Sequence, residues 1–229
     1  MKTIGLLGGM SWQSTIEYYR IINEEVGRRL GGLHSAKMVV YNVDFSEIAE
    51  MQRRGEWDAA GERLAEAARA LERAGADLVL ICANTMHIVA DAVQQAVRIP
   101  LVHLADVTAA RVKQAGLTRV GLLGTMYTME KDFLKHRLSA HGLAVQVPDA
   151  EDREAVHRII YDELCLGIIT EESRRRVVDM AERLVRQGAE GILLGCTELM
   201  LLIRPGDLSV PEFDTTRIHA ESAVEMALN

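Results

Sequence analysis

The sequence lacks several features that would place it in common functional classes. Its 229 residues carry a net charge of −7, and the only basic run, residues 174–176, falls early in a predicted helix. A protein that binds a nucleic-acid backbone needs a basic face. No apolar run approaches the roughly 20 residues that span a bilayer, and the apolar start is broken by Gly8-Gly9 too early for a secretory leader. We therefore expect neither a nucleic-acid nor a membrane partner.

Cysteine is scarce, and its spacing does not suit a metal. Only Cys82, Cys165 and Cys196 are present, an odd number in a chain large enough to build its own core, which is typical of free thiols in a reducing cytoplasm. No pair has the spacing of zinc ligands, and there is no HExxH pattern. Residues 5–9 lack the GxGxxG spacing of a dinucleotide site. We predict a cytoplasmic protein without a zinc site or a dinucleotide site.

The chain alternates short apolar segments with longer amphipathic ones. Strands are expected over residues 3–7, 37–43, 78–81, 99–102, 119–123, 145–147, 191–194 and 209–213. Helices are expected between them, including residues 12–30, 57–74, 85–97, 106–115, 149–165, 170–187 and 214–228. This alternation predicts an α/β fold with parallel sheets covered by helices.

An internal repeat divides the chain. Residues 5–10 (GLLGGM) resemble residues 121–126 (GLLGTM), and about 75 residues further on in each half comes a cysteine-containing strand end, residues 82–85 and 195–198. Two repeats in the same order predict a duplicated unit of roughly 100 residues. We expect one half over residues 1–103, to which residues 213–229 return, and another over residues 104–212. Ligands of such sheets bind beyond the carboxyl ends of the strands, so the four turns are expected to converge on one cleft.

Cys196 is the strongest candidate for chemistry, although a free cysteine is often only a small buried apolar residue. It stands between a strand end and a predicted helix, whose dipole and free amides are expected to favour the thiolate. Cys82 and Ala83 should point to opposite sides, because side chains alternate along a strand, and Cys82 is expected to pack beneath the site. The spacing of Cys165 leaves open whether it belongs to the core or to the cleft wall.

Several motifs together resemble the aspartate/glutamate racemase family over essentially the whole chain. They are Gly8-Gly9-Met10-Ser11, Asn84-Thr85 with His87, Leu123-Gly124-Thr125 and Gly195-Cys196-Thr197-Glu198. A resemblance to the bacterial L-aspartate/glutamate-specific and broad-specificity amino-acid racemases is carried by residues 31–35, 52–57, 84–87 and 213–215. It implies two pseudo-twofold-related flavodoxin-like α/β/α halves, an active site in the cleft between them, a homodimer, and catalysis without pyridoxal phosphate or metal.

The resemblance also implies an isomerase with two bases, one on each face of the substrate α-carbon. Cys196 matches one base, whereas the other position is Ala83, which has no proton to exchange. This leaves three hypotheses: a racemase disabled at one base, a slow racemase in which a water or Thr85 replaces it, or a one-thiol enzyme like the arylmalonate decarboxylases. A protein that only binds an amino acid or dicarboxylate is a fourth reading.

The substrate is expected to contact residues of the strand-end turns and of the segment after the second strand. These residues are Met10, Ser11, Gln52, Arg53, Asn84, Thr85, Thr125, Cys165, Thr197 and Glu198. The resemblance makes Gln52 the best match to a ligand position, with Arg53 beside it. Aspartate-specific members often carry a lysine where Cys165 stands here, which implies broader substrate acceptance.

Overall fold

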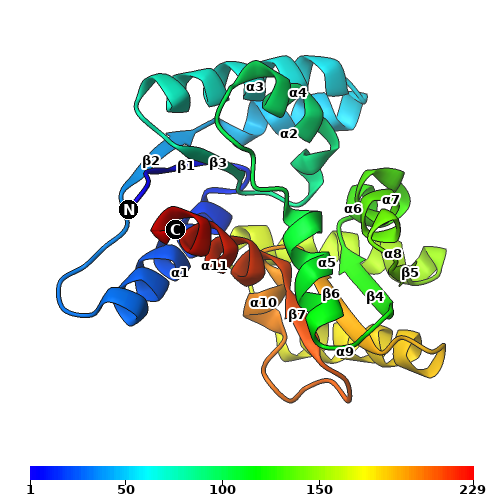
Figure 1. Ribbon diagram of the computed structural model, residues 1–229. Coiled ribbons are helices and arrows are strands. Elements are labelled where there is room, and N and C mark those ends of the chain that lie inside the picture. Colours follow the sequence, from blue (N-terminus) through cyan, green and yellow to red (C-terminus); the bar gives the residue numbers. More distant parts are fainter. The chain divides into compact units, whose positions relative to one another are not determined.

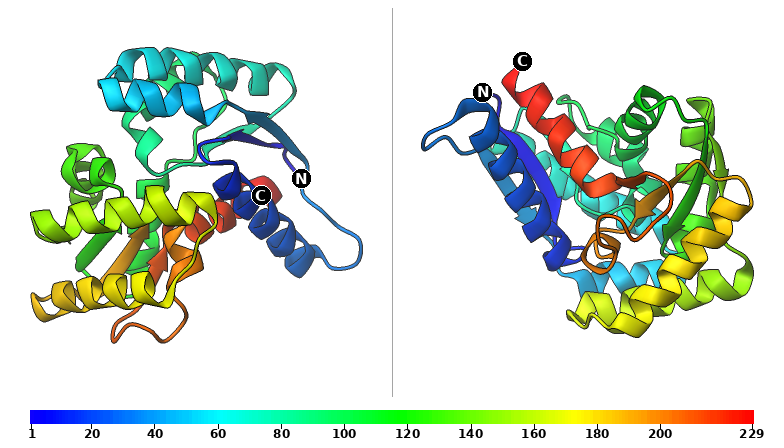
Figure 2. Two further views of the ribbon diagram at one scale, coloured as in Figure 1. Left: turned by 180° about the vertical axis from the view of Figure 1, so that it is seen from behind. Right: turned by 90° about the horizontal axis from the view of Figure 1, so that it is seen from below.

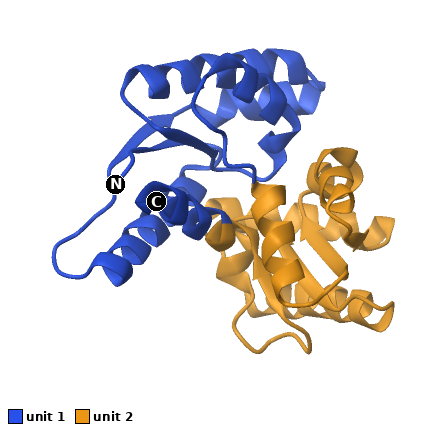
Figure 3. Ribbon diagram, viewed as in Figure 1, with its two compact units in different colours: residues 1–103, 219–229 blue, residues 104–218 orange.

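The computed structural model describes residues 1–229 and divides them into two compact units. Unit 1 comprises residues 1–103 and 219–229, and unit 2 comprises residues 104–218 (Figure 3). The expected return of residues 213–229 to the N-terminal half is therefore wrong for residues 213–218. They stay in unit 2 because the strand over residues 212–214 hydrogen-bonds into the sheet of that unit, where Phe213 lies opposite Leu193.

Unit 1 is built on a parallel sheet of three strands. Their order is β2 (Met38–Asn42), β1 (Ile4–Gly8) and β3 (Leu78–Ile81). Its helices are α1 (Trp12–Leu30), α2 (Phe45–Arg54), α3 (Trp57–Arg73), η1 (Thr85–Val89), α4 (Ala90–Ala96) and, from His219, the end of α11 (Thr215–Leu228). Figure 1 shows α1 and α11 below this sheet and α2, α3 and α4 above it. Every residue of β1 and β3 is buried, as expected of parallel strands with both faces covered.

Unit 2 is built on a parallel sheet of four strands. Their order is β5 (Ala144–Gln146), β4 (Arg119–Gly124), β6 (Gly191–Gly195) and β7 (Glu212–Asp214). Its helices are α5 (Leu104–Gln114), α6 (Met126–Glu130), α7 (Asp132–Ala140), α8 (Ala150–Arg158), η2 (Ile159–Glu163), η3 (Leu164–Leu166), α9 (Glu171–Arg186) and α10 (Leu199–Leu202). The sheets confirm the predicted α/β fold with parallel strands.

Polar residues at the helix starts and glycines at the strand ends position the turns. The Ser11 side chain accepts a hydrogen bond from the Ser14 amide at the start of α1, which satisfies a backbone donor that the helix leaves open. In unit 2, a β-carbon on Gly195 would lie 2.9 Å from the Leu123 carbonyl oxygen, and one on Gly124 would lie 2.8 Å from the Gly195 oxygen. Only glycine at these two positions lets the ends of β4 and β6 approach so closely.

The ends of the chain meet within unit 1. The Lys2 amide donates a hydrogen bond of 2.8 Å to the Ala227 carbonyl oxygen, and Figure 2 shows the end of α11 near the start of β1 in both views. The last turn of α11 is thus attached to the first strand of the sheet.

Four predicted elements differ from the observed ones, and one of them is the strand expected over residues 209–213, which is β7 (Glu212–Asp214). The strand expected over residues 99–102 is reduced to one parallel bridge between Leu101 and Val79. The helix expected over residues 85–97 is a short 3₁₀ helix followed by α4, and the one expected over residues 149–165 is split into α8, a π-helical turn and a 3₁₀ turn. Apolar periodicity predicts that a segment is helical, but it does not distinguish helix types that place side chains in similar directions.

Candidate active site

The sheet register relates the two cysteine-containing strand ends. In unit 1, Leu7 of β1 lies opposite Ile81 of β3, and in unit 2, Leu123 of β4 lies opposite Leu194 of β6. Since residues 5–8 repeat as residues 121–124, the second residue after Ile81 corresponds to the second residue after Leu194. Ala83 is therefore the positional counterpart of Cys196.

Cys82 has no access to this position. It is fully buried in unit 1, and its amide donates a hydrogen bond of 2.9 Å to the Leu7 carbonyl oxygen, which extends the β1–β3 ladder by one residue. Burial raises the pKa of the Cys82 thiol above its ordinary range. The thiol therefore stays protonated, and Cys82 behaves as a core residue, in agreement with the prediction that it packs beneath the site.

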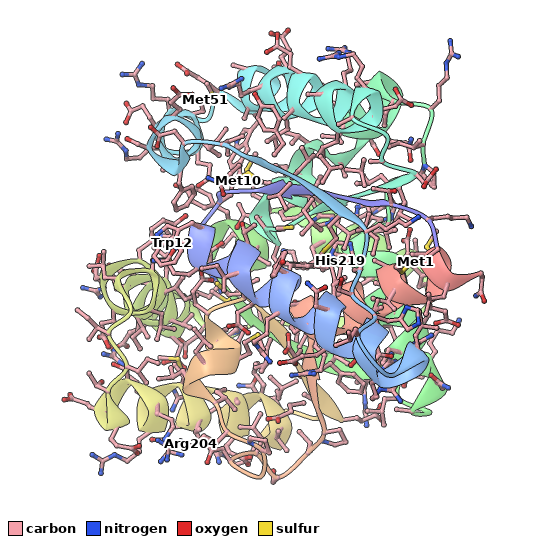
Figure 4. The ribbon with its side chains drawn as sticks, turned by 90° about the vertical axis from the view of Figure 1, so that its left-hand side faces the viewer. Met1, Met10, Trp12, Met51, Arg204 and His219 are labelled. Carbon is pink, nitrogen blue, oxygen red and sulfur yellow. The ribbon has the colours of Figure 1, made fainter.

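Met86 links a buried polar residue of α2 to the segment that follows β3. Met10, Ala83 and Met86 belong to one cluster of buried apolar side chains, and Met10 lies at the turn between β1 and α1 (Figure 4). The buried Gln52 side chain on α2 donates a hydrogen bond of 3.1 Å from Nε2 to the Met86 sulfur. This contact joins α2 to the segment that follows β3.

Arg53 lies apart from this group. Its side chain is 72% exposed on α2 and forms an ion pair with Glu50, one turn earlier. Neighbouring residues of a helix point about 100° apart, so the burial of Gln52 turns Arg53 outward. The structure thus brings one member of the predicted Gln52-Arg53 pair to the strand end and leaves the other on the surface.

A group of buried histidines lies behind Ala83. His87 Nδ1 lies 3.0 Å from the Ala83 carbonyl oxygen, and its ring is 4.8 Å from that of His103 and 5.5 Å from that of His219. A carbonyl oxygen only accepts, so Nδ1 of His87 carries the proton. Asn84 and Thr85 are also buried here. The contact of His87 holds the backbone of Ala83.

His219 connects this group to α1. Its Nε2 donates a hydrogen bond of 2.7 Å to the Val102 carbonyl oxygen, and its Nδ1 accepts one of 2.8 Å from the Tyr18 hydroxyl. Figure 4 shows His219 on α11 beside α1. Burial, reinforced by the proximity of His87, lowers the pKa of His219 to about 3, so the ring is neutral at physiological pH.

In unit 2, three predicted residues contact the carboxylate of a fourth, Glu198. Cys196 Sγ lies 2.9 Å from Glu198 Oε2, and Thr197 donates from its hydroxyl to the same oxygen at 2.6 Å. Cys165 Sγ donates to Glu198 Oε1 at 3.8 Å. Cys196 is 7% exposed and Glu198 4%. Cys165, whose place the spacing left open, is half-buried, packs against the core of unit 2 and faces this carboxylate.

The prediction that the surroundings of Cys196 favour its thiolate is wrong. Burial, together with the adjacent Glu198 carboxylate, raises the pKa of the Cys196 thiol well above its ordinary value. The same two causes raise the pKa of the Cys165 thiol to about 12. The segment after Cys196 is a turn followed by α10, which has only four residues, so it supplies little of the helix dipole on which the prediction rested. The resting form of Cys196 is therefore the thiol.

Thr125 leaves the sheet of unit 2 beside Cys196. Gly124 and Gly195 are partners in the β4–β6 register, so the next residues, Thr125 and Cys196, follow neighbouring strand ends. The Thr125 side chain caps α6 by accepting a hydrogen bond from the Thr128 amide at 3.2 Å. The sequence therefore placed Thr125 at the correct strand end, where the structure gives it a capping role.

Tyr161 is a further residue of this region that the sequence did not single out. It lies on the π-helical η2, and burial, the largest cause, together with nearby acidic groups that include Glu198, raises the pKa of its hydroxyl. Its ring is 4.7 Å from that of His157, whose own pKa is lowered by burial. No local pattern in the sequence singles out Tyr161, since its importance depends on what it faces.

Two further observations concern metal ligands and membrane-spanning helices. No group of three or more His, Cys, Asp or Glu side chains is arranged to hold a metal ion. None of the helices has the length and apolarity needed to cross a membrane.

The strand-end turns, the duplicated sheets and the GCTE segment agree with one family. The Asp/Glu/hydantoin racemase family model matches residues 7–223, and the chain belongs to this family. The chain is similar to a protein from Yersinia pestis described as a candidate Asp/Glu racemase, with 53% identity, full coverage of both chains and a TM-score of 0.94. It is also similar to an aspartate racemase homologue from Pyrococcus horikoshii OT3, with 38% identity, full coverage of both chains and a TM-score of 0.87.

A third relative is less similar in sequence. The broad specificity amino-acid racemase RacX of Bacillus subtilis is 21% identical over 235 residues, which cover 98% of each chain. These matches confirm the resemblance to the racemase family, and with it the α/β fold inferred from the sequence.

Proposed function

We propose that this protein is an isomerase-type enzyme that moves the α-proton of an amino acid without a cofactor, with Cys196 as its base. One observation carries the proposal. In a chain of the racemase family, the sheet register makes Ala83 the counterpart of Cys196. The chain thus keeps a thiol at one of two equivalent strand ends and has only a methyl group at the other.

The proposed chemistry begins with the ionised Cys196 sulfur taking the α-proton. The electron pair of the broken C–H bond moves into the substrate carboxylate, which becomes an enediolate. Without a cofactor as electron sink, the protein has to stabilise this charge with hydrogen-bond donors aimed at the carboxylate oxygens. We propose that donors of the turns around Ser11, Asn84-Thr85 and Thr197 supply this stabilisation.

Inversion needs a second group to protonate the opposite face of the enediolate. Ala83 carries no such group, so the proton is returned by Cys196 to the face from which it came. We therefore propose that the protein exchanges the α-proton of one enantiomer with solvent and inverts it slowly or not at all. A water or Thr85 in place of the second base is the alternative, and it predicts measurable inversion.

The test is to incubate the native protein in D₂O with L- and D-aspartate and with L- and D-glutamate. Proton NMR measures loss of the α-proton signal, and chiral chromatography measures inversion. We expect deuterium to enter one enantiomer with its configuration retained. Inversion at the rate of exchange would show that a second base is present, and the absence of exchange from all four substrates would overturn the proposal.

The single thiol also suits a one-base decarboxylase, in which an enediolate formed by loss of CO₂ is protonated from one face. Release of CO₂ from an arylmalonate, without α-proton exchange of amino acids, would favour that function. A binding protein makes a third prediction: saturable binding of an amino acid or dicarboxylate by calorimetry, unaffected by Cys196→Ala and without any turnover.

Substrate range, assembly and location are further parts of the proposal. Cys165 offers no positive charge to a side-chain carboxylate, which supports acceptance of amino acids beyond aspartate. All three cysteines are free thiols, which supports a reducing cytoplasm. A homodimer is proposed from the resemblance to the family. Turnover of neutral amino acids, and light scattering of the purified protein, test the first and the last of these statements.

A further inference from the structure

β2 forms an open edge of the sheet in unit 1. It lies at the end of the strand order and pairs only with β1. The opposite edge is partly closed, because the Val79 amide donates to the Pro100 carbonyl oxygen and the Val102 amide donates to the Val79 carbonyl oxygen, at 2.9 Å each. The sheet of unit 2 ends in strands of only three residues, whereas β2 has five. β2 is therefore the longest edge strand of the protein.

The pairing of β2 with β1 shows which of its backbone groups face outward. The Lys37 carbonyl oxygen accepts a hydrogen bond of 2.9 Å from the Ile4 amide of β1. Backbone groups alternate in direction along a strand, so the odd-numbered residues of this segment face β1. The amides and carbonyl oxygens that point away from the sheet, without a hydrogen-bond partner in the chain, are those of Met38, Val40 and Asn42.

The edge lacks the features by which sheet edges avoid pairing. Natural edges are protected by proline, bulges, charged side chains or a covering segment. β2 contains neither proline nor a charged residue, and its central Val40 is 43% exposed. Leu33, in the connection from α1, is fully exposed, and this connection stands away from the rest of unit 1 (Figure 1). An open apolar edge of this kind is typical of a strand that pairs with another chain.

The charges at the two ends of β2 indicate the partner and its direction. Lys37 precedes the strand, Asp44 and Glu47 follow it, and all three are exposed. When two β2 strands pair in antiparallel orientation, the basic start of one copy lies beside the acidic end of the other. Parallel pairing would instead bring like charges together, which is unfavourable. A second, antiparallel copy is thus complementary to this edge in both hydrogen bonding and charge.

We infer that two copies of the protein associate through β2 about a twofold axis and join their three-stranded sheets into one. The inference rests on the homodimer of the proposed function and names its surface. Outward-facing residues have to pair with one another, so Val40 of one copy lies opposite Val40 of the other, and Met38 lies opposite Asn42. Each pair exchanges two backbone hydrogen bonds, and the two Val40 side chains cover one another. The contact uses the same surface on both copies and closes at two.

The first test introduces a cysteine in place of Val40. In the proposed pairing the two Cα atoms of Val40→Cys lie about 5.5 Å apart, within the range that a disulfide spans. We expect oxidation by air with copper phenanthroline to give a covalent dimer on a non-reducing gel. Asn42→Cys is the matched control, because its two copies lie roughly 14 Å apart along the strands and should not cross-link. The native protein controls for cross-links through its three free cysteines.

The second test measures the dissociation constant of the dimer by sedimentation equilibrium. Val40→Lys places like charges opposite each other at the centre of the edge and should raise the constant about tenfold or more. Lys37→Glu removes the charge complementarity at both ends and should raise it about fivefold. Lys113→Glu makes the same change of charge at an exposed position on α5 and should leave the constant unchanged.

A folded Val40→Lys variant that dimerises as tightly as the native protein would overturn the inference, as would equal cross-linking of Val40→Cys and Asn42→Cys. If circular dichroism shows that Val40→Lys does not fold, the cross-linking decides. A native protein that stays monomeric would overturn the proposed homodimer as well. A native dimer that does not cross-link in Val40→Cys would overturn the inference alone, because the copies then meet at another surface. α-Proton exchange, measured on the same samples, tests the proposed chemistry separately.

Discussion

The ends of β3 and β6 are equivalent in the sheet and different in chemistry. After β6, the thiols of Cys196 and Cys165 both contact the carboxylate of Glu198. After β3, the equivalent Ala83 offers only a methyl group, and its carbonyl oxygen receives the ring N–H of His87. The duplication therefore preserves the backbone path at both ends, while only one end retains a group that can move a proton.

The two strand ends also differ in the contacts that surround them. The backbone of Ala83 accepts a hydrogen bond from His87, whose ring lies 5.5 Å from that of His219, and His219 joins α11 to the Tyr18 hydroxyl on α1. At the Cys196 end, burial and the Glu198 carboxylate raise the pKa values of the Cys196 and Cys165 thiols.

The largest effect is expected from removing the remaining base. Cys196→Ala should reduce α-proton exchange on the order of 10³-fold or more, because no other proton-moving side chain stands at an equivalent strand end. The measurement is loss of the α-proton NMR signal in D₂O. Cys82→Ala is the matched control, since it removes a buried thiol one residue before Ala83 and should lower the melting temperature without slowing exchange. Slower exchange in Cys82→Ala would show that the Cys82 thiol takes part in the reaction, which contradicts the proposal.

The next effect concerns the missing base. Ala83→Cys should introduce inversion of aspartate or glutamate, detected by chiral chromatography, at a rate approaching that of exchange, and Ala83→Thr should introduce slower inversion. The reason is that Ala83→Cys places a thiol at both strand ends. Ala83→Ser, with a less acidic hydroxyl, should give less inversion than Ala83→Cys. Variants that fold and exchange normally but never invert would show that Ala83 does not occupy the second base position.

A smaller effect is expected on stability, at the histidine group behind Ala83. The pKa of His219 is about 3 in the folded protein, against 6.5 ordinarily. Between these values the unfolded chain binds more protons, so stability is complete above about pH 6.5 and is lost as the pH falls toward 3. His219→Asn should lower the melting temperature at pH 7.5 and flatten its decline between pH 7.5 and 5. His34→Asn, at an exposed position, should leave both unchanged. A decline as steep in His219→Asn as in the native protein would refute the assignment.

The smallest effect is expected at Arg53. Its exposed side chain pairs with Glu50, so Arg53→Ala should change the half-saturating substrate concentration by less than about twofold, as exposed ion pairs contribute little. Gln52→Ala should raise that concentration about 10-fold, because loss of a buried hydrogen bond to a charged ligand costs about 1.5 kcal/mol or more. The exchange assay at varied substrate concentration measures both. Equal effects of the two variants would mean that the burial of Gln52 does not decide which residue binds.

Much of the fold could be predicted from the sequence, because its determinants are local. The apolar segments of β1, β3, β4 and β6 and the helix α1 were located within one residue at each end, since strand and helix periodicities are written in neighbouring residues. The single bridge at Leu101 and the interrupted helix before Cys165 were not located as closely. Their form depends on which segments lie beside them.

The site divides in the same way. The sequence by itself determined the family, the two strand-end segments and the identity of Cys196 and Ala83, because these are matters of residue type and spacing. Only the tertiary structure decided that Glu198 accepts from both Cys196 and Cys165, that His87 supports the Ala83 backbone, and that the Cys196 thiol rests in its protonated form. Protonation depends on burial and on charges brought together from distant parts of the chain, and neither is encoded in the local pattern.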